Sequence, residues 1–428
     1  MMLFLTLWLF GEYSENTLSQ DDIQPGHLLN PDYRFMAHGV HTYEHLRSLL
    51  TALYASNNPV LEQALQAYLE KLEGCLTPSG GPIGDEFILG RLADASQTGY
   101  EYCSIHELLD SYSHLLQKTG EMRWAERIEW LLFNAAQGAR HPHESAIAYL
   151  KTDNSFSMSG LFQLNDHVDE KNPQTRYKYS PAHRDVAVCC VPNAGRIHPY
   201  YVKAMWMRSE QGLTAMLYGA SNLQTDVDGV AVRITEETNY PFDFELSFSI
   251  EVAQPVEFEL AFRKPAWVDA FHLDGEYDWH EVNGLIIIKK SWQGSERIHL
   301  RFEAGVKVNP FGGEAYLSYG PLLFALPLEG QVRPGKEYPL AGFQDLYYDL
   351  TGSNAADLLL PARDGNAPLY PFGVERGVFD EPHPWDSLAL TGGLFDAITR
   401  QMKPVRLVSM GGTLLRRVTF GRTLSNEI

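Results

Sequence analysis

The stretch SIHELLDSYSHLLQKTGEMRWAERIEWLLFNAAQG (residues 104–138) predicts two helices joined by a tight turn. Ser104, followed by Glu107 three residues later, is typical of a helix start, and Gly120 is typical of a helix end. The second helix follows at once, so the two segments form a helical hairpin. This hairpin predicts that the first half of the chain is built from packed helices.

Helical patterns continue on both sides of the hairpin. Three further segments predict helices, residues 43–56, 60–74 and 193–207. Gly74 is expected to cap the second of these segments, and Asn193 is expected to be the N-cap of the third. The apolar start, MMLFLTLWLF (1–10), predicts a further buried helix, which gives about six helical stretches before Met207.

The composition and the apolar pattern of the sequence change near residue 208. Short segments rich in Val, Ile and Phe, several with alternating apolar and polar residues, indicate an all-β region of sandwich type. A second β stretch begins at residue 314. We therefore expect a multidomain α plus β protein, with a helical region over 1–207 and two β-sandwich, jelly-roll-like domains over 208–311 and 312–428.

Composition restricts the partners and the compartment. The 34 Lys and Arg against 54 Asp and Glu give a net charge of −20, which disfavours nucleic acid and anionic membranes as partners. Four cysteines in 428 residues do not form a disulfide framework, so a reducing, cytoplasmic setting is expected. The apolar start lacks the flanks of a signal peptide and is too short to span a bilayer.

Acidic and thiol side chains cluster in the helical half. AVCCVPN (187–193) places Cys189 beside Cys190, and YEYC (100–103) places Glu101 two residues before Cys103. One carboxylate and three thiolates are a ligand set that zinc accepts. The spacing alone is not a standard zinc pattern, and buried free thiols are the favoured alternative on spacing alone.

The order of several short motifs carries a resemblance to a known family. GGPIGDEF (80–87), YEYC, the hairpin segment, CCVPN and GPLLFAL (320–326) follow one another as in glycoside hydrolase family 127. The chain resembles these β-L-arabinofuranosidase-type enzymes from about His38 to near its end, less closely after residue 330 or so. The resemblance implies an (α/α) helical barrel followed by β-sandwich domains.

The resemblance also implies roles for individual residues. It implies a Zn²⁺ ion held by Glu101, Cys103, Cys189 and Cys190, with Cys189 also serving as the nucleophile. Glu86 matches the family's acid/base, and the neighbouring Asp85 takes that place if the match shifts by one residue. His38 of HGV and Tyr149 of IAYLKTDN match residues that contact the substrate. The loop DHVDEKNPQTRYKYS (166–180) receives no role.

These roles form a coherent chemistry. A retaining glycosidase needs a nucleophile at the anomeric carbon and a proton donor for the leaving oxygen. Zinc would keep Cys189 ionised, and a hydrophobic setting beside an anionic site is expected to raise the pKa of Glu86. The expected activity is release of a terminal β-L-arabinofuranose-like sugar from an oligosaccharide or glycoside.

Two other functions remain open at this point. The zinc could be structural, in a non-catalytic glycan-binding protein or an inactive remnant. The helical barrel could also serve a lyase or an unsaturated-uronyl hydrolase, although those chemistries do not need the thiols.

The helical region also predicts an incomplete (α/α)6-type barrel. A complete six-hairpin barrel needs about twelve helices, twice the number that the sequence predicts. We therefore expect a crescent of helices that lacks the first part of the family's barrel. Apolar surface left exposed on such a crescent would favour association into a homo-oligomer.

Overall fold

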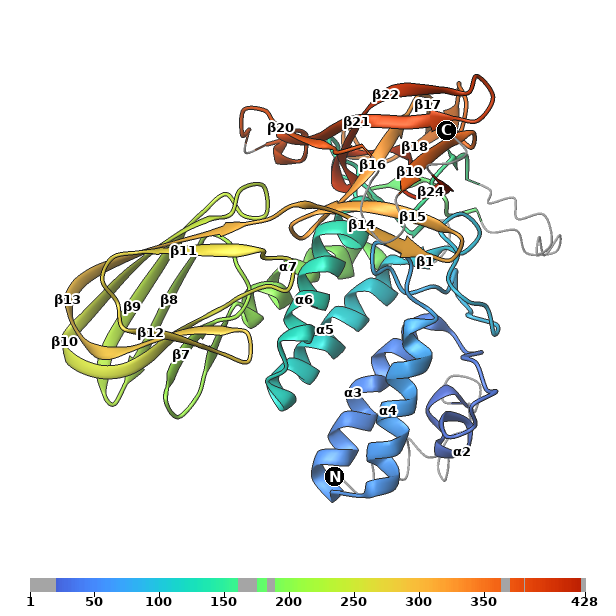
Figure 1. The fold of residues 1–428 in the computed structure, drawn as a ribbon. Helices are drawn as coiled ribbons and strands as arrows, with labels where there is room; N and C mark the ends of the chain where they lie inside the picture. The colour runs from blue at the N-terminus through green and yellow to red at the C-terminus, as the bar shows by residue number, and fades with distance from the viewer. Residues whose placement is uncertain (1–20, 161–174, 183–188, 363–369, 381, 425–428) are drawn as a thin grey trace.

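The computed structural model describes residues 21–160, 175–182, 189–362, 370–380 and 382–424 (Figure 1). The helix expected over 1–10 lies outside these residues. The protein is a mixed α plus β structure, in which a group of helices adjoins two separate β regions (Figure 1). In the described part of the chain, no helix combines the length and the apolar character needed to cross a membrane.

The helices of the first half confirm most of the sequence pattern. They are η2 (Asp21–Ile23), α2 (Pro25–Leu28), α3 (Gly39–Ser56), α4 (Pro59–Glu73), α5 (Tyr102–Thr119), α6 (Met122–Trp130), the π-helical η3 (Leu131–Ala136) and α7 (Cys190–Ala204). The hairpin of α5 and α6 is confirmed, because Gly120 ends α5 in the left-handed region at φ 67°. Glycine adopts this conformation without the steric cost that a side chain brings.

Two expected helix caps are wrong. Helix α5 begins at Tyr102 with Glu101 as its N-cap, so Ser104 lies inside the helix. Glu107 instead accepts a hydrogen bond of 2.6 Å from Arg47 of α3. Helix α7 begins at Cys190, so Asn193 also lies inside its helix.

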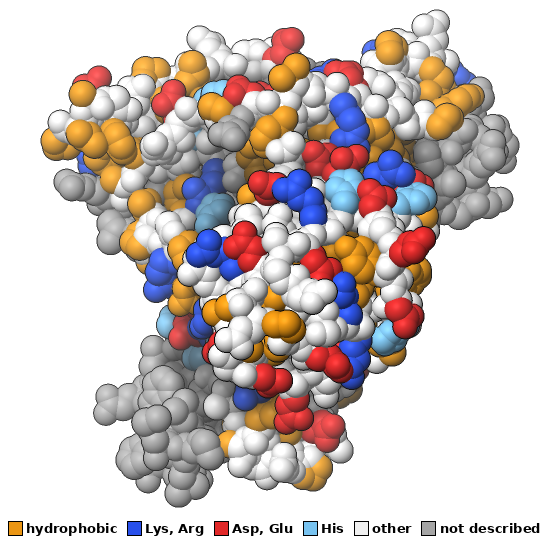
Figure 2. Space-filling model, turned by 90° about the vertical axis from the view of Figure 1, so that its left-hand side faces the viewer, with side chains coloured by type: hydrophobic (Ala, Val, Ile, Leu, Met, Phe, Trp, Pro, Cys, Tyr) orange, Lys and Arg blue, Asp and Glu red, His pale blue; other side chains and the backbone are white. Residues whose placement is uncertain are grey.

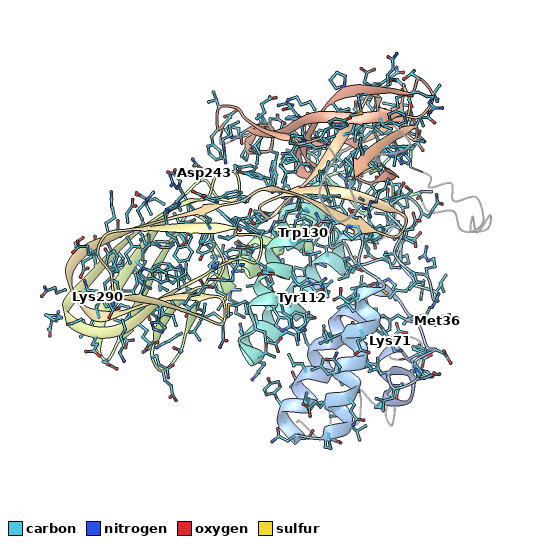
Figure 3. All side chains as sticks on the ribbon, in the orientation of Figure 1. Met36, Lys71, Tyr112, Trp130, Asp243 and Lys290 are labelled. Carbon is cyan, nitrogen blue, oxygen red and sulfur yellow. The ribbon has the colours of Figure 1, made fainter. Side chains whose placement is uncertain are left out.

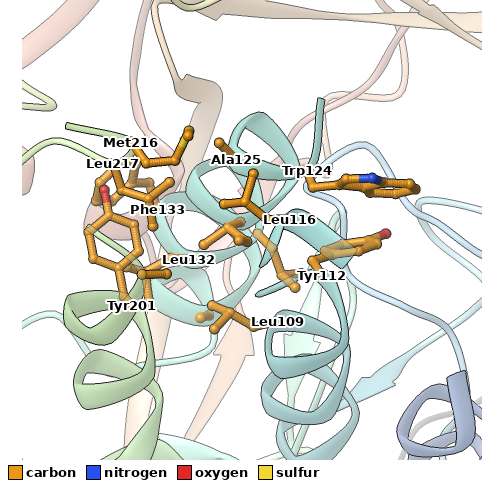
Figure 4. Packing of buried hydrophobic residues seen from close by; sticks show 14 of the residues in the cluster. Leu109, Tyr112, Leu116, Trp124, Ala125, Leu132, Phe133, Tyr201, Met216 and Leu217 are labelled. Carbon is orange, nitrogen blue, oxygen red and sulfur yellow. The ribbon is translucent and has the colours of Figure 1, made fainter. Parts of the chain in front are cut away.

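Helix α5 is the centre of the helical core. It packs against α3, α6 and α7. Figure 4 shows Leu109 and Leu116 of α5 beside Leu132 of η3. Tyr201 of α7 and Met216 close the same cluster from the side of the middle β region. Burial of these side chains fixes the relative positions of the helices whose N-terminal ends carry the chemistry described below.

The middle β region is one sheet bent over itself. Its strands are β6 (Trp206–Arg208), β7 (Gly212–Ala215), β8 (Ser221–Val227), β9 (Val230–Glu237), β10 (Glu245–Arg263), β11 (Ala270–Asp274), β12 (Trp279–Val282) and β13 (Leu285–Glu303). The long strands β10 and β13 pair along their whole length, with a register shift between Val252 and Val256. Before the shift β10 pairs with β9, and after it β10 pairs with β7.

The C-terminal β region contains a second large sheet. Its strands are β14 (Val306–Phe311), β15 (Glu314–Tyr319), β16 (Leu322–Leu328), β19 (Leu358–Ala362), β20 (Gly373–Arg376), β21 (Leu388–Asp396), β22 (Gln401–Ser409), β23 (Leu415–Arg417) and β24 (Phe420–Leu424), with η4 (Pro384–Asp386) and η5 (Met410–Gly412) between them.

A smaller sheet joins distant parts of the chain. Its strands are β2 (Ile147–Ala148), β4 (Ser157–Met158), β5 (Tyr179–Ser180), β17 (Gly330–Glu337) and β18 (Gln344–Leu350). Strand β18 pairs with β17, β4 and β5, so residues from both sides of the middle region share one sheet. A further short ladder joins β1 (Tyr100–Glu101) to β3 (Leu150–Lys151). The domain boundaries expected at 207 and 311 stay a prediction.

Two buried polar networks link these layers. Glu129 of α6 forms an ion pair of 2.5 Å with the fully buried Arg263 of β10, and Tyr240 donates a hydrogen bond of 2.9 Å to the same carboxylate. Arg416 of β23 donates to the carbonyl oxygens of Gly138, Thr152 and Asp153 at 2.7–3.0 Å. Charges can be buried here because each one has partners.

One further hydrogen bond holds the loop that precedes residues 80–87 against α6. Trp130 donates a hydrogen bond of 2.9 Å to the carbonyl of Pro78, which fastens the loop before residues 80–87 to α6 (Figure 3).

Figure 2 shows basic side chains interspersed with acidic ones on the face that it presents. The excess of negative charge therefore forms no uniform patch on that face.

Candidate active site and metal centre

The N-terminal ends of three helices meet at one place. His38 is the N-cap of α3, Glu101 is the N-cap of α5 and Cys189 is the N-cap of α7. None of these side chains caps its own helix; instead they approach one another, with His38 Nε2 at 3.8 Å from Glu101 Oε2 and Glu101 Oε1 at 3.9 Å from Cys189 Sγ. Helix N-terminal ends carry partial positive charge, which favours carboxylates and thiolates.

Glu101, Cys103, Cys189 and Cys190, hereafter the thiol cluster, converge as the sequence predicts. Their nearest ligand atoms all lie within 4.8 Å of one another. Cys103 Sγ lies 3.1 Å from Cys190 Sγ, which in turn lies 3.4 Å from Glu101 Oε1.

The thiol cluster has the size and chemistry of a zinc site. A tetrahedral zinc ion with Zn–S distances of about 2.3 Å places its ligands about 3.8 Å apart, close to the observed spacing. Glu101 Oε2 is buried and has no hydrogen-bond partner among the described residues, which is costly unless a cation or a donor satisfies it. The cluster could therefore hold a metal, and a borderline-soft ion with tetrahedral preference suits three sulfurs and one oxygen.

The three thiols of the cluster are not equivalent. Hydrogen bonds from Cys103 and then Cys190 lower the pKa of Cys189 to about 2. The pKa of Cys190 is raised well above its usual range, chiefly by burial, and that of Cys103 is raised chiefly by its hydrogen bond to Cys189. Burial raises the pKa of Glu101 to about 7. Cys189 is also the exposed member, so it is the thiolate that can react.

Glu86 lies beside the thiol cluster, and ligand atoms of Glu86, His38 and Glu101 lie within 4.8 Å of one another. His38 Nε2 lies 3.1 Å from Glu86 Oε2, and Arg176 forms an ion pair with Glu86 Oε1. The Tyr149 hydroxyl lies 3.5 Å from Glu86 Oε1 and 3.7 Å from Cys189 Sγ. The structure therefore places His38, Glu86 and Tyr149 beside the thiol cluster.

The neighbouring Asp85 has different surroundings. Its carboxylate pairs with Arg91, which also donates to the carbonyl oxygen of Phe87. Of the two adjacent carboxylates, Glu86 is the one in contact with His38, Tyr149 and Arg176.

The expected rise in the pKa of Glu86 is wrong for this geometry. Burial alone would raise the pKa, but the hydrogen bond from His38 and the charge of Arg176 outweigh burial, and the pKa is lowered. For His38 burial acts to lower the pKa, yet the hydrogen bond to Glu86 and the charge of Glu101 raise it overall. A proton shared by this pair therefore resides on the histidine.

The sequence did not identify two of the residues that contact this site. Asn193 donates a hydrogen bond of 3.0 Å to Cys103 Sγ, whereas the sequence predicted a helix cap. Arg176 comes from the loop that received no role, and no local pattern marks it as a partner of a carboxylate 90 positions earlier.

The fold is similar to the folds of several solved structures. The fold is similar to that of a GH127 β-L-arabinofuranosidase from Geobacillus stearothermophilus T6, with a TM-score of 0.68 and 18% identity over 91% of this chain and 61% of that chain. It is similar to a glycoside hydrolase with a TM-score of 0.72 and 16% identity over 98% of this chain and 71% of that chain. A GH127 β-arabinofuranosidase gives a TM-score of 0.71 and 13% identity over 98% of this chain and 64% of that chain. The chain thus has the fold of these three structures.

The middle β region matches a known family profile. Residues 212–304 match the family profile "Beta-L-arabinofuranosidase, GH127 middle domain", so the resemblance to glycoside hydrolase family 127 is confirmed. A search of curated protein sequences gives no match. The chain spans less than two thirds of the length of two of the three structures above.

Proposed function

We propose that the protein is a retaining glycoside hydrolase that releases a terminal β-L-arabinofuranose-like sugar from an oligosaccharide or glycoside. One observation carries the proposal: the Tyr149 hydroxyl lies within 3.7 Å of both Cys189 Sγ and the Glu86 carboxylate. The sulfur of Cys189 and the carboxylate of Glu86 therefore both lie close to a single hydroxyl. Retaining glycosidases place a nucleophile and an acid/base in such proximity.

Zinc is the metal that we propose for the thiol cluster. Glu101, Cys103, Cys189 and Cys190 would hold it, and a bound Zn²⁺ would supply positive charge that keeps buried thiolates ionised. The N-terminal ends of α5 and α7 supply further partial positive charge to the same sulfurs.

The protein's own residues account for each bond change. In the first step Cys189 Sγ forms a bond to the anomeric carbon while the bond to the leaving oxygen breaks and Glu86 donates a proton to that oxygen. In the second step Glu86 takes a proton from water, the water oxygen bonds to the anomeric carbon, and the C–S bond breaks to restore the thiolate. Because Glu86 rests ionised, His38 Nε2, at 3.1 Å from Glu86 Oε2, passes to Glu86 the proton that Glu86 donates in the first step. After the second step Glu86 returns to His38 the proton that it took from water, which restores the resting state.

We also propose that α3 to α7 are part of an (α/α)6-type barrel and that the two β regions are sandwich domains. The similarity of fold to the GH127 structures over more than nine tenths of this chain supports this assignment. The crescent of helices and the homo-oligomer stay predictions.

Kinetic comparison of variants tests the function. The purified chain, with and without a chelator, is assayed on aryl glycosides and on plant-polysaccharide fragments. Cys189→Ser should abolish turnover, whereas Glu86→Gln should slow substrates with poor leaving groups most and be partly rescued by an activated aryl glycoside. Cys75→Ser is the matched control, because Cys75 is a buried thiol outside the cluster whose pKa burial raises to about 12.

Two results would contradict the proposal. Normal activity of Cys189→Ser would exclude this residue as the nucleophile. Stoichiometric zinc with no turnover of any glycoside would favour the alternative of a non-catalytic protein with a structural metal.

A further inference from the structure

Arg176 has a position that the proposed reaction does not yet explain. Only 7% of its side chain is exposed, and it forms an ion pair with Glu86 Oε1. Its guanidinium group lies 4.5 Å from the centroid of the Tyr149 ring. One side chain thus contacts both the carboxylate of Glu86 and the ring of Tyr149, whose hydroxyl lies near Glu86 and Cys189.

Glu86 needs external support to hold its orientation. Its backbone has φ 86°, in the left-handed region that side chains other than glycine rarely adopt. Such a conformation persists only where its surroundings hold it in place. Its carbonyl accepts a hydrogen bond of 2.8 Å from Gly39 N, and the two carboxylate oxygens are divided between His38 and Arg176. With both oxygens engaged, the plane of the carboxylate is fixed.

Arg176 is itself anchored by the C-terminal half of the chain. The strand that follows it, β5, pairs with β2 on one side and with β18 on the other. Two residues after Arg176, the buried Lys178 forms an ion pair of 2.8 Å with the buried Asp345 of β18. The described part of the 166–180 loop therefore connects β18 to the carboxylate of Glu86.

We propose that Arg176 is a positioning residue, which holds the Glu86 carboxylate and the Tyr149 ring in the geometry that proton transfer requires. This inference rests on the proposed glycosidase function. Arginine suits the task because its planar group can pair with a carboxylate and stack on an aromatic ring at the same time. Lysine offers a point charge without the planar geometry, so Arg176→Lys should recover only part of the function.

A double-mutant cycle tests this role. Arg176→Gln should lower kcat/KM about 100-fold for an alkyl glycoside but less than about 10-fold for a dinitrophenyl glycoside, because the activated leaving group needs little protonation. In a Glu86→Gln background the same change should cost no more than about 2-fold, because the residue that Arg176 positions is already lost. Arg47→Gln is the matched control: it removes an ion pair between α3 and α5 that does not contact Glu86, and it should leave the leaving-group dependence unchanged.

The results separate this role from a structural one. Equal losses for both leaving groups, or full additivity with Glu86→Gln, would overturn the positioning role. If the wild type cleaves no glycoside, the proposed function fails, and crystal structures of the Arg176→Gln and Arg47→Gln variants decide the inference. Displacement of the Glu86 and Tyr149 side chains in the first variant alone supports it, and an unmoved pair refutes it.

Discussion

Acidification should weaken zinc binding to the thiol cluster far more steeply than at an ordinary surface site. Metal ligands must be deprotonated, so each proton that the free cluster carries competes with the ion. Cys103 and Cys190, whose pKa values are raised, are both protonated at neutral pH, and each must lose a proton. Cys189, with its pKa lowered to about 2, carries none, and Glu101, with its pKa raised to about 7, is half protonated at pH 7.

The size of the effect follows from these protons. Two protonated thiols together contribute about a 100-fold change in affinity per pH unit. Protonation of Glu101, whose pKa is about 7, lowers the zinc affinity by a further factor of about 5 between pH 7 and 6. Between pH 8 and 7 the same residue is mostly ionised, and the further factor is only about 2. The affinity should therefore fall about 200-fold from pH 8 to 7 and about 500-fold from pH 7 to 6.

Competition with a chromophoric chelator of known pH dependence measures this directly, under reducing conditions. Calorimetry in buffers with different ionisation enthalpies counts the protons released, with an expected value between two and three at pH 7. Glu101→Gln should bind zinc more weakly but lose the extra steepness below pH 7, and Cys75→Ser should match the wild type. A change of less than about 10-fold per pH unit would refute the assignment of two protonated thiols to the cluster.

Three further predictions concern the surroundings of the cluster. Asn193→Leu removes the donor to Cys103 and should weaken zinc binding about 10- to 100-fold in the same competition assay, with unchanged affinity as the contrary result. Gly99→Ala should abolish zinc binding, because the added carbon would clash with a buried tyrosine hydroxyl just before β1, whereas Gly195→Ala, which meets nothing within 4 Å, should bind normally. Glu129→Leu should lower the free energy of unfolding in urea by about 3–5 kcal/mol, because it leaves Arg263 buried without a counter-charge; a Glu129→Leu, Arg263→Met double variant should recover most of that loss, and equal stability of the single and double variants would contradict this.

The residues whose convergence the sequence predicted lie in compact local motifs. Glu101 with Cys103, and Cys189 with Cys190, each occupy one helix N-terminal end, so the fold has only to bring two short segments together. The family resemblance then supplied Glu86, His38 and the middle β region. The helical hairpin was predictable as well, because its turn depends on a glycine with a positive φ.

The predicted starts of two helices were wrong because the local sequence allows each helix to begin at more than one residue. Asn193 is a good helix cap, but Pro192 is tolerated within the first turn of a helix, and α7 therefore begins earlier, at Cys190. Ser104 was likewise predicted to be a helix cap, but α5 begins at Tyr102 with Glu101 as its N-cap, so Ser104 lies inside the helix.

Long-range pairs set the remaining limit on prediction from sequence. Burial would raise the pKa of Glu86, but the hydrogen bond from His38 and then the charge of Arg176 lower it. No spacing rule connects either partner to Glu86, so the sequence predicted the wrong direction for this pKa. The linkage of Arg176 to Asp345 through Lys178 is equally invisible in the sequence, because it depends on the pairing of β5 with β18.

The pairing of β5 with β18 also sets the order of events while the chain is being synthesised. Leu346 of β18 pairs with Tyr179 of β5, and the ribosome must add all the residues between them before this ladder can close. At about 5–20 residues per second, that interval lasts roughly 8–33 s. During this time the thiols of the N-terminal half have already emerged, while the strand that anchors Arg176 has not. The four proposed zinc ligands are therefore all synthesised many seconds before the strand that anchors Arg176, the residue that we propose positions Glu86.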